Sequence, residues 1–174
     1  MRLIKKLIQN GVCFPGSNGG KMVIGFTCAT FDLFHAGHIL MLKEAKKVCD
    51  HLIVGLQTDP TIDRPEKNKP VQSVFERYTQ LQACKYVDEI VIYATEKELI
   101  DILLAYPINV RILGEEYENR DFTGREVCVD MGMKFHFNKR KHSFSTTELR
   151  ERVIDAEANK NLDQWIIDER LGKL

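Results

Sequence analysis

The chain has no hydrophobic run of the length that a membrane span requires. Its 174 residues are 44% apolar, but polar residues interrupt every apolar stretch before the ~18 residues of a transmembrane helix are reached. The amino-terminal segment Met1-Arg2-Leu3-Ile4-Lys5-Lys6 is basic and partly apolar. It lacks the uninterrupted apolar core of roughly 7 to 15 residues that is typical of a secretory signal. We therefore expect a cytoplasmic protein with no membrane partner.

The sequence also lacks an excess of either charge and any paired cysteine spacing. Lys plus Arg and Asp plus Glu number 25 each, so no overall field favours binding to nucleic acid. The five cysteines are scattered without C-x-x-C spacing, which favours reduced thiols in a cytoplasmic protein. The length suits a single globular domain.

Strand-like and helix-like segments alternate along the chain. Strands are predicted at residues 22–26, 51–56, 89–92, 110–113 and 134–137, and helices at 37–50, 73–85, 96–106 and 146–158. Helical crossovers between strands produce parallel pairing, so we expect an α/β, Rossmann-like domain with a five-stranded parallel sheet flanked by helices. Residues 21–158 are assigned to this domain, 1–20 to an N-terminal extension, and 159–174 to a C-terminal helix that packs on the domain or on a second subunit.

Two histidines stand where the first strand leads into the first helix. Asp32, His35 and His38 surround a tight turn, and the unpaired N–H groups and dipole of a helix start favour an anion there. If a nucleoside triphosphate lay there, imidazoles three residues apart could both donate hydrogen bonds to its phosphate oxygens as charge builds on the leaving group. A zinc pair is the alternative, but no further Cys or His falls at an obvious ligand spacing. Asp32 has three candidate roles: binding magnesium, orienting a loop amide, or capping the helix.

A second anion-binding element is predicted about a hundred residues later. Ser145 and Glu148 form an S-x-x-E capping box, so Ser145, Thr146 and Thr147 open a helix whose amides and hydroxyls can bind phosphates. A simple helix cap is the alternative. The basic run Lys139-Arg140-Lys141-His142 precedes this element. Its position favours contact with phosphate over a solvated loop.

These motifs resemble those of the H-x-G-H nucleotidyltransferase superfamily, in the same order. Thr30-Phe31-Asp32 and His35-Ala36-Gly37-His38 resemble the T-F-D and H-x-G-H boxes, and Phe144-Ser145-Thr146-Thr147 resembles the I-S-T-T/S element. Between them, Tyr86-Val87-Asp88-Glu89 and Gly114-Glu115-Glu116-Tyr117 follow the order found in glycerol-3-phosphate cytidylyltransferases. The resemblance extends over residues 22–150.

The resemblance implies transfer of CMP from CTP to a small phosphorylated alcohol, such as glycerol 3-phosphate, with release of pyrophosphate. It implies Mg²⁺ as cofactor, with Asp32 near the metal, and a homodimer whose contact includes the start of the helix at 73–85. Catalytic roles are implied for His35, His38, Lys69 and Arg140. The residues implied to bind the nucleotide are Thr30, Phe31, Asp32, Gly37, Arg77, Gly114, Glu115, Ser145, Thr146 and Thr147.

Several positions depart from the family's pattern. Lys85 and Glu115 replace an arginine and an aspartate, Ala29 replaces a glycine, and residues 140–144 read Arg-Lys-His-Ser-Phe where the family has R-T-E-G-I. These changes lie where nucleotide and acceptor are recognised, so the alternatives concern the substrates. One is an adenylyltransferase acting on pantetheine phosphate, a flavin mononucleotide or a sugar phosphate. Another is a catalytically silent subunit that binds a nucleotide.

Overall fold

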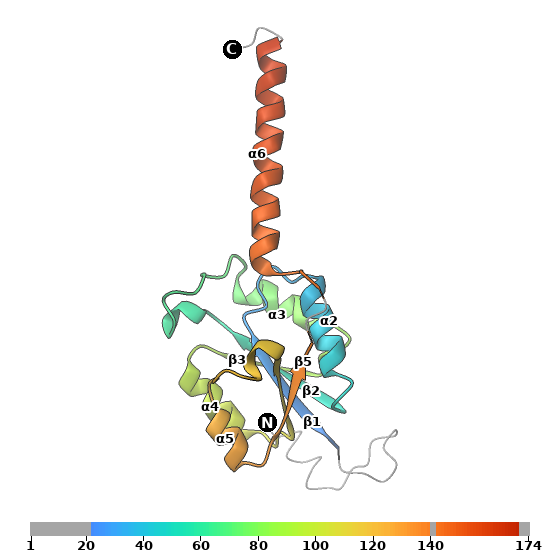
Figure 1. Ribbon diagram of the computed structural model, residues 1–174, viewed down its shortest axis with the longest axis vertical. Coiled ribbons are helices and arrows are strands. Elements are labelled where there is room, and N and C mark those ends of the chain that lie inside the picture. The colour runs from blue at the N-terminus through green and yellow to red at the C-terminus, as the bar shows by residue number, and fades with distance from the viewer. Residues whose placement is uncertain (1–21, 140–141, 171–174) are drawn as a thin grey trace.

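A computed structural model describes residues 22–139 and 142–170, without the side chains of residues 162–169. The described chain forms a parallel sheet with helices on both faces (Figure 1). The strands are β1 (Ile24–Ala29), β2 (His51–Gln57), β3 (Glu89–Tyr93), β4 (Val110–Gly114) and β5 (Lys134–Asn138). The helices are α2 (Ala36–Ala45), α3 (Val74–Gln82), α4 (Glu96–Ala105), α5 (Arg125–Asp130) and α6 (Thr146–Arg170), with short 3-10 turns η1 (Pro60–Ile62) and η2 (Glu115–Tyr117).

The strand order confirms the predicted Rossmann-like fold with a five-stranded parallel sheet. The five strands are arranged β3-β2-β1-β4-β5, and every neighbouring pair is parallel. The chain runs outward from β1 to β3 and then returns to the other side of β1 as β4. Gly25 of β1 consequently pairs with Leu52 on one side and Val110 on the other. In such sheets ligands bind at the carboxyl ends of the strands, where the order reverses.

The central strands are largely apolar because helices cover both faces of the sheet. Side chains alternate between the faces of a strand. Leu52 and Val54 of β2 pack with Leu42 of α2 and Leu81 of α3. Ile53, on the opposite face, belongs to a second cluster, which includes Phe26, Leu99, Leu103 and Cys128 from β1, α4 and α5. The two clusters hold the strand ends in fixed positions relative to one another.

Helix α6 is a single element from Thr146 to Arg170 that projects from the domain (Figure 1). The sequence analysis predicted that this helix would end near Ala158, but the first glycine or proline after Thr146 is Gly172, so nothing interrupts it. Residues 151–161 are exposed. The packing predicted for the C-terminal segment involves the side chains of residues 162–169, which are not described. The N-terminal extension predicted at residues 1–20 also lies outside the described residues. No helix in the described part of the chain is both long and apolar enough to cross a bilayer.

Candidate active site

The loop between β1 and α2 carries Asp32 in an unusual backbone conformation. Phe31 and Leu33, on either side of it, have φ angles of 53° and 47°. The left-handed region costs a non-glycine residue roughly 1–2 kcal/mol, so other contacts must hold this loop in place. Phe31 supplies one of them, because its side chain is buried and its ring lies 5.2 Å from the ring of His38, centroid to centroid.

His35 and His38 form the start of α2, and their rings stack with centroids 3.9 Å apart. Nδ1 of His35 accepts the amide of Gly37 at 3.1 Å, and Nδ1 of His38 accepts the amide of His35 at 3.4 Å. A neutral imidazole that accepts at Nδ1 carries its proton on Nε2. Each ring therefore offers an Nε2–H donor, and Nε2 of His35 lies 3.4 Å from Oγ1 of Thr146. That hydroxyl donates in turn to the Asp32 carbonyl at 3.1 Å.

His38 is neutral at physiological pH. Burial lowers its pKa to about 3, the neighbouring His35 adds to this effect, and Asp32 opposes it. Protonation at Nδ1 would also break the hydrogen bond from the His35 amide. His38 is thus suited to donating a hydrogen bond to developing negative charge, not to gaining and losing a proton.

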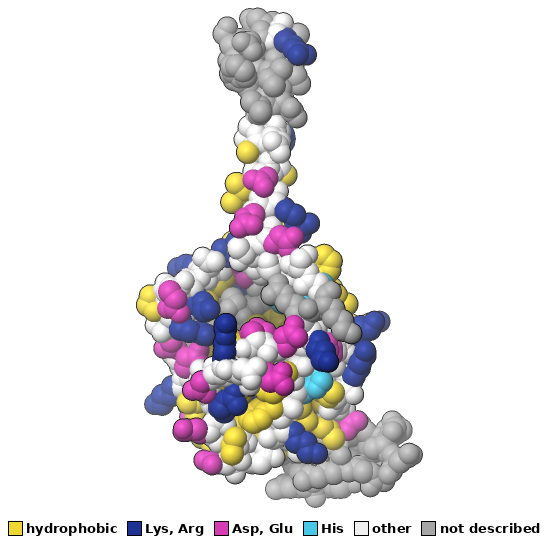
Figure 2. Space-filling view, in the orientation of Figure 1, with side chains coloured by type: hydrophobic (Ala, Val, Ile, Leu, Met, Phe, Trp, Pro, Cys, Tyr) yellow, Lys and Arg dark blue, Asp and Glu magenta, His cyan; other side chains and the backbone are white. Residues whose placement is uncertain are grey.

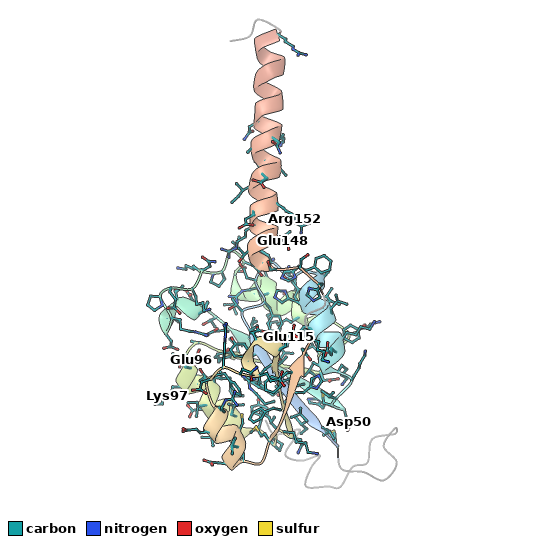
Figure 3. The ribbon with its side chains drawn as sticks, viewed as in Figure 1. Asp50, Glu96, Lys97, Glu115, Glu148 and Arg152 are labelled. Carbon is teal, nitrogen blue, oxygen red and sulfur yellow. The ribbon has the colours of Figure 1, made fainter. Side chains whose placement is uncertain are left out.

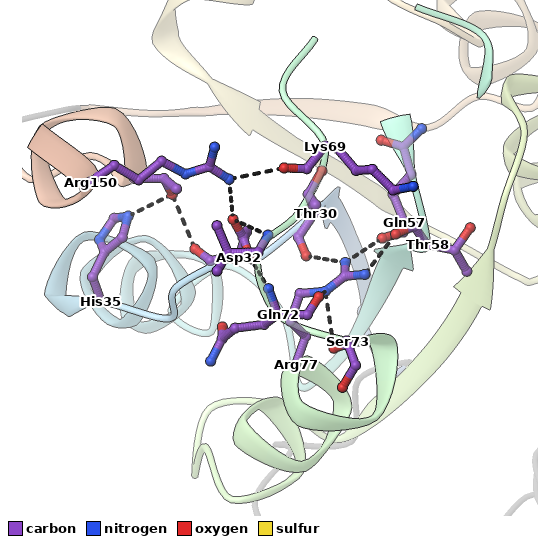
Figure 4. Close-up of polar contacts among 12 residues, drawn as sticks. Thr30, Asp32, His35, Gln57, Thr58, Lys69, Gln72, Ser73, Arg77 and Arg150 are labelled. Carbon is purple, nitrogen blue, oxygen red and sulfur yellow. Dashed lines mark hydrogen bonds and ion pairs between the residues drawn. The ribbon is translucent and has the colours of Figure 1, made fainter. Parts of the chain in front are cut away.

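The Asp32 carboxylate is fully occupied by contacts within the chain (Figure 4). Its oxygens accept the amide of Val71 at 3.0 and 3.1 Å, the amide of Gln72 at 2.9 Å, and Nη2 of Arg150 at 2.6 Å. Burial alone would raise the pKa of Asp32, but the hydrogen bonds from Gln72, Arg150 and Val71 outweigh it and hold this pKa below its usual value. Asp32 therefore orients loop amides, which is one of the roles considered from the sequence.

This arrangement does not fit Asp32 as a magnesium ligand. Mg²⁺ needs oxygen ligands at about 2.0–2.1 Å in near-octahedral geometry, whereas the lone pairs of Asp32 already face amides and a guanidinium. Within residues 22–139 and 142–170, no three His, Cys, Asp or Glu side chains are grouped so that they could hold a metal ion.

Arg77 lies beneath the loops instead of facing a ligand. Only 1% of it is exposed, and every hydrogen bond that its guanidinium makes goes to a backbone carbonyl (Figure 4). The acceptors are the carbonyls of Thr30 (2.8 Å), Gln57 (2.6 Å), Thr58 (2.6 Å), Gln72 (3.1 Å) and Ser73 (3.3 Å). These carbonyls follow β1 and β2 or precede α3. The nucleotide-binding role predicted for Arg77 is therefore replaced by a positioning role.

Two cavities meet at the histidines. The first, of about 630 Å³, lies over the ends of β1, β2 and β4 and extends to α4. The second, of about 810 Å³, lies between α2 and β5. Both are lined by His38, Met41, Gly114, Glu116 and Thr146. The space-filling view shows this face hollowed below the base of α6, with acidic and basic side chains around the hollow (Figure 2).

Comparison with known families agrees with this architecture. Residues 26–152 match the cytidylyltransferase-like family. The chain belongs to that family. The resemblance inferred from the sequence motifs is thereby confirmed at the level of family and fold.

The individual relatives of this cytidylyltransferase-like chain are longer proteins. The bifunctional protein HldE of Caulobacter vibrioides is 34% identical over 131 residues, which are 75% of this chain and 27% of HldE. An ethanolamine-phosphate cytidylyltransferase of Arabidopsis thaliana is 31% identical over 134 residues, 74% of this chain and 32% of the relative. A solved structure of a lipopolysaccharide core biosynthesis protein from Thermoplasma volcanium has a TM-score of 0.56 at 24% identity and covers 71% of this chain and 100% of its own, which shows a shared fold.

Most of the residues predicted for the site, whether catalytic or nucleotide-binding, line at least one of the two cavities. Thr30, Phe31, Asp32 and Thr147 line the first, His35, Gly37 and Ser145 line the second, and His38, Gly114 and Thr146 line both. A Cβ atom at Gly37 would lie 2.9 Å from Cε1 of His35, and one at Gly114 would lie 2.2 Å from Oε2 of Glu116. Oγ of Ser145 accepts the amide of Glu148 at 3.1 Å, so the predicted start of α6 is correct.

The remaining predicted residues lie elsewhere. Lys69 and Glu115 are exposed and line neither cavity; Glu115 extends beyond the end of β4 (Figure 3). The next residue, Glu116, lines both cavities. Arg140 falls outside the described residues.

The residues of the first cavity that were not predicted from the sequence include Gln57, Arg64, Arg111 and Arg150. One signal was present, because Arg111 is a charged residue inside the apolar run Val110-Arg111-Ile112-Leu113. A charge in a buried strand is rare unless it has a partner. No comparable local signal marked Arg150, which meets Asp32 across 118 residues.

Proposed function

We propose that this chain transfers CMP from CTP to a small phosphorylated alcohol, releasing pyrophosphate. The observation that carries the proposal is that His38 lines both cavities, with Nδ1 accepting the His35 amide so that the ring proton lies on Nε2. Two adjoining sites suit a reaction between two substrates. Membership of the cytidylyltransferase-like family and the ethanolamine-phosphate cytidylyltransferase relative support CTP as the nucleotide.

The proposed chemistry needs no general base. A phosphate oxygen of the acceptor is already an anion and attacks the α-phosphorus of CTP, forming a P–O–P bond. The bond from the α-phosphorus to the oxygen that bridges to the β-phosphorus breaks, and pyrophosphate leaves with the electron pair. Catalysis then consists of alignment and of stabilising charge on that bridging oxygen. His38 and His35 supply donors for this purpose, and the start of α6 supplies amides and hydroxyls for the outer phosphates.

Magnesium, in this proposal, arrives on the triphosphate. Mg²⁺ commonly keeps several water ligands and binds substrate phosphates, so it does not depend on the occupied carboxylate of Asp32.

The homodimer also remains a prediction. Val71 and Phe75, near the start of α3 where the contact is expected, are 65% and 78% exposed, and light scattering of the purified chain tests the assembly.

Asn138 supports a base that carries an exocyclic amino group. It lines the second cavity, is 5% exposed, and donates from Nδ2 to the Met41 carbonyl at 3.2 Å. This bond assigns Oδ1 as the free acceptor, and no described residue donates to it. Cytosine carries an amino group at the ring position where uracil carries a carbonyl. Asn138 thus favours CTP over UTP.

The test is pyrophosphate release with Mg²⁺ across CTP, ATP, UTP and GTP. The acceptors are glycerol 3-phosphate, phosphoethanolamine, phosphocholine, pantetheine phosphate and several sugar phosphates. We expect turnover with CTP and at least one phosphorylated alcohol. Turnover with ATP alone would replace the proposal with an adenylyltransferase. Nucleotide binding in calorimetry without pyrophosphate release from any pair would support the silent subunit and reject both enzymes.

A further inference from the structure

Arg111 is a buried arginine, the second residue of β4, and contributes to the wall of the first cavity. Only 3% of it is exposed, and its guanidinium lies over the ring of Phe26 at 4.8 Å. Nη2 donates to Sγ of Cys28 at 3.1 Å. Among the described residues, Nε and Nη1 have no hydrogen-bond partner, and no carboxylate forms an ion pair with this guanidinium.

This guanidinium is unfavourable for the protein without a ligand. A buried charge needs a paired charge or a full set of hydrogen bonds to offset its loss of hydration, and a thiol sulfur is only a weak acceptor. An apolar side chain of similar volume often fills such a position with equal or greater stability. Folding therefore gives no reason for a charge here, whereas an anion entering the cavity would supply the missing partner.

Among the buried side-chain atoms of this wall that have no partner in the described chain, donors outnumber acceptors. Gln57 is 3% exposed, and its Nε2 has no partner within the described chain. Nε of Arg64 also has no hydrogen-bond partner within the described chain, although Nη2 of Arg64 lies 2.9 Å from Oε1 of Glu96. The acceptor without a partner in this group is Oε2 of Glu96. This balance fits a ligand rich in oxygen atoms and negative overall.

The register of the sheet sets how far this anion lies from the reaction centre. Arg111 pairs with Phe26, while its guanidinium reaches Cys28, two residues before Thr30. The end of β4 at Gly114 is three residues beyond Arg111. At about 3.3 Å per residue, these separations correspond to roughly 7–10 Å. A group at Arg111 is thus too deep to be the phosphate that reacts beside His38.

Building on the proposed function, we infer that the acceptor carries a second anionic group, such as a carboxylate, at the end opposite its reacting phosphate, and that Arg111 binds this group. The acceptor is then a phosphorylated hydroxy acid about 7–10 Å long between its two charges. A cationic far end, such as the amine of phosphoethanolamine, is rejected because it would meet an uncompensated guanidinium.

The experiment compares acceptors of equal length that differ only at the far end. The pairs are 3-phosphoglycerate with glycerol 3-phosphate, 4-phosphoerythronate with erythritol 4-phosphate, and 6-phosphogluconate with glucitol 6-phosphate. We expect at least one acid to exceed its neutral partner about 10- to 100-fold in kcat/KM and in calorimetric affinity, the effect of one or two charged hydrogen bonds. In Arg111→Met this ratio falls to about 1, while the Kd for CTP does not increase and the Tm does not decrease.

Arg125→Met is the matched control. Arg125 also stacks on an aromatic ring, that of Phe122 at 4.4 Å, but it donates to the carbonyls of Tyr117 and Arg120 and does not line the first cavity. Its substitution should leave the acid-to-neutral ratio unchanged.

Three outcomes overturn the inference: no acid binds better than its neutral partner, Arg111→Met keeps the ratio, or Arg111→Met lowers the Tm and weakens both members of each pair alike. The calorimetric arm is independent of turnover. Binding of acids through Arg111 without any pyrophosphate release would therefore reject the proposed function while upholding this site.

Discussion

Arg77 and Arg111 are both almost completely buried near the same cavity, yet their surroundings are opposite. Arg77 lies on the α3 side, where five backbone carbonyls accept from its guanidinium. Arg111 lies on the α4 side, where a thiol accepts one bond and, among the described residues, nothing accepts from Nε or Nη1. Arg77 thus stabilises the folded loops, whereas Arg111 keeps N–H donors that a ligand can bind.

The same contrast separates other residues of the site into two sets. Asp32 resembles Arg77, because amides and Arg150 take up its hydrogen-bonding capacity; we call Asp32 and Arg77 the anchors. His38 and Asn138 resemble Arg111, since each of the three lines a cavity; we call these three the ligand-facing residues. Changes to the anchors should mainly reduce stability, and changes to the ligand-facing residues should mainly reduce function.

The largest effect is expected from His38→Ala. Loss of a donor to the transition state should lower kcat by roughly two to four orders of magnitude, with the Kd for CTP changed only a few-fold. Steady-state kinetics and calorimetry measure both quantities. His38→Gln, which keeps an N–H donor, should recover part of the rate. His51→Ala, which changes a histidine paired with Glu89 away from both cavities, serves as control. A higher KM with unchanged kcat would place His38 among groups that only bind substrate.

Arg77→Met tests the other half of the comparison. Removing the guanidinium leaves several buried carbonyls without a donor, so the free energy of unfolding should fall by about 3–5 kcal/mol. Urea unfolding followed by circular dichroism measures this change, and Arg77→Lys should fall between the two because lysine lacks the planar fork. Arg152→Met, at an exposed position on α6, should have little effect. Equal stability of Arg77→Met and the unmodified chain would remove Arg77 from the anchors.

The two arginines also show what the sequence reveals and what it hides. Periodicity predicted the strands and the parallel sheet, because the pattern of buried residues is local. The motif around His35 and His38 placed the histidines at the cavity junction, since their spacing fixes them on one helical turn. The direction of Arg77 was not local information: at the start of α3 it can face either solvent or the strand ends, and the tertiary fold decides. Glu116, not Glu115, lines the cavities for the same reason.

A smaller effect, with a defined pH dependence, is expected for Asp32→Asn. The asparagine loses charged hydrogen bonds with Arg150 and the loop amides, which should lower stability by about 2–3 kcal/mol at pH 7. The pKa of Asp32 is lower in the folded chain than its ordinary value. Its stabilising contribution is therefore complete above about pH 4, the unfolded value, and is lost as the pH falls through the folded pKa.

Urea unfolding of the unmodified chain and of Asp32→Asn at pH 7, 5, 4 and 3 measures this dependence. The difference between the two chains should stay constant down to pH 5 and shrink below pH 4. Asp121→Asn, which removes an exposed pair with Arg125, should change stability by less than about 1 kcal/mol. A difference that persists unchanged at pH 3 would show that the charge of Asp32 is not what anchors the loop.

The smallest effect is expected for Asn138→Leu. This substitution tests whether Asn138 recognises the nucleotide base or only stabilises the fold. Without the free Oδ1, the cavity no longer distinguishes an exocyclic amino group from a carbonyl, so the ratio of kcat/KM for CTP over UTP should fall about 10-fold, the worth of one hydrogen bond. Asn119→Leu, at an exposed position after η2, should leave the ratio intact. If CTP and UTP instead lose activity equally, the bond from Asn138 to the Met41 carbonyl is what matters, and Asn138 belongs with the anchors.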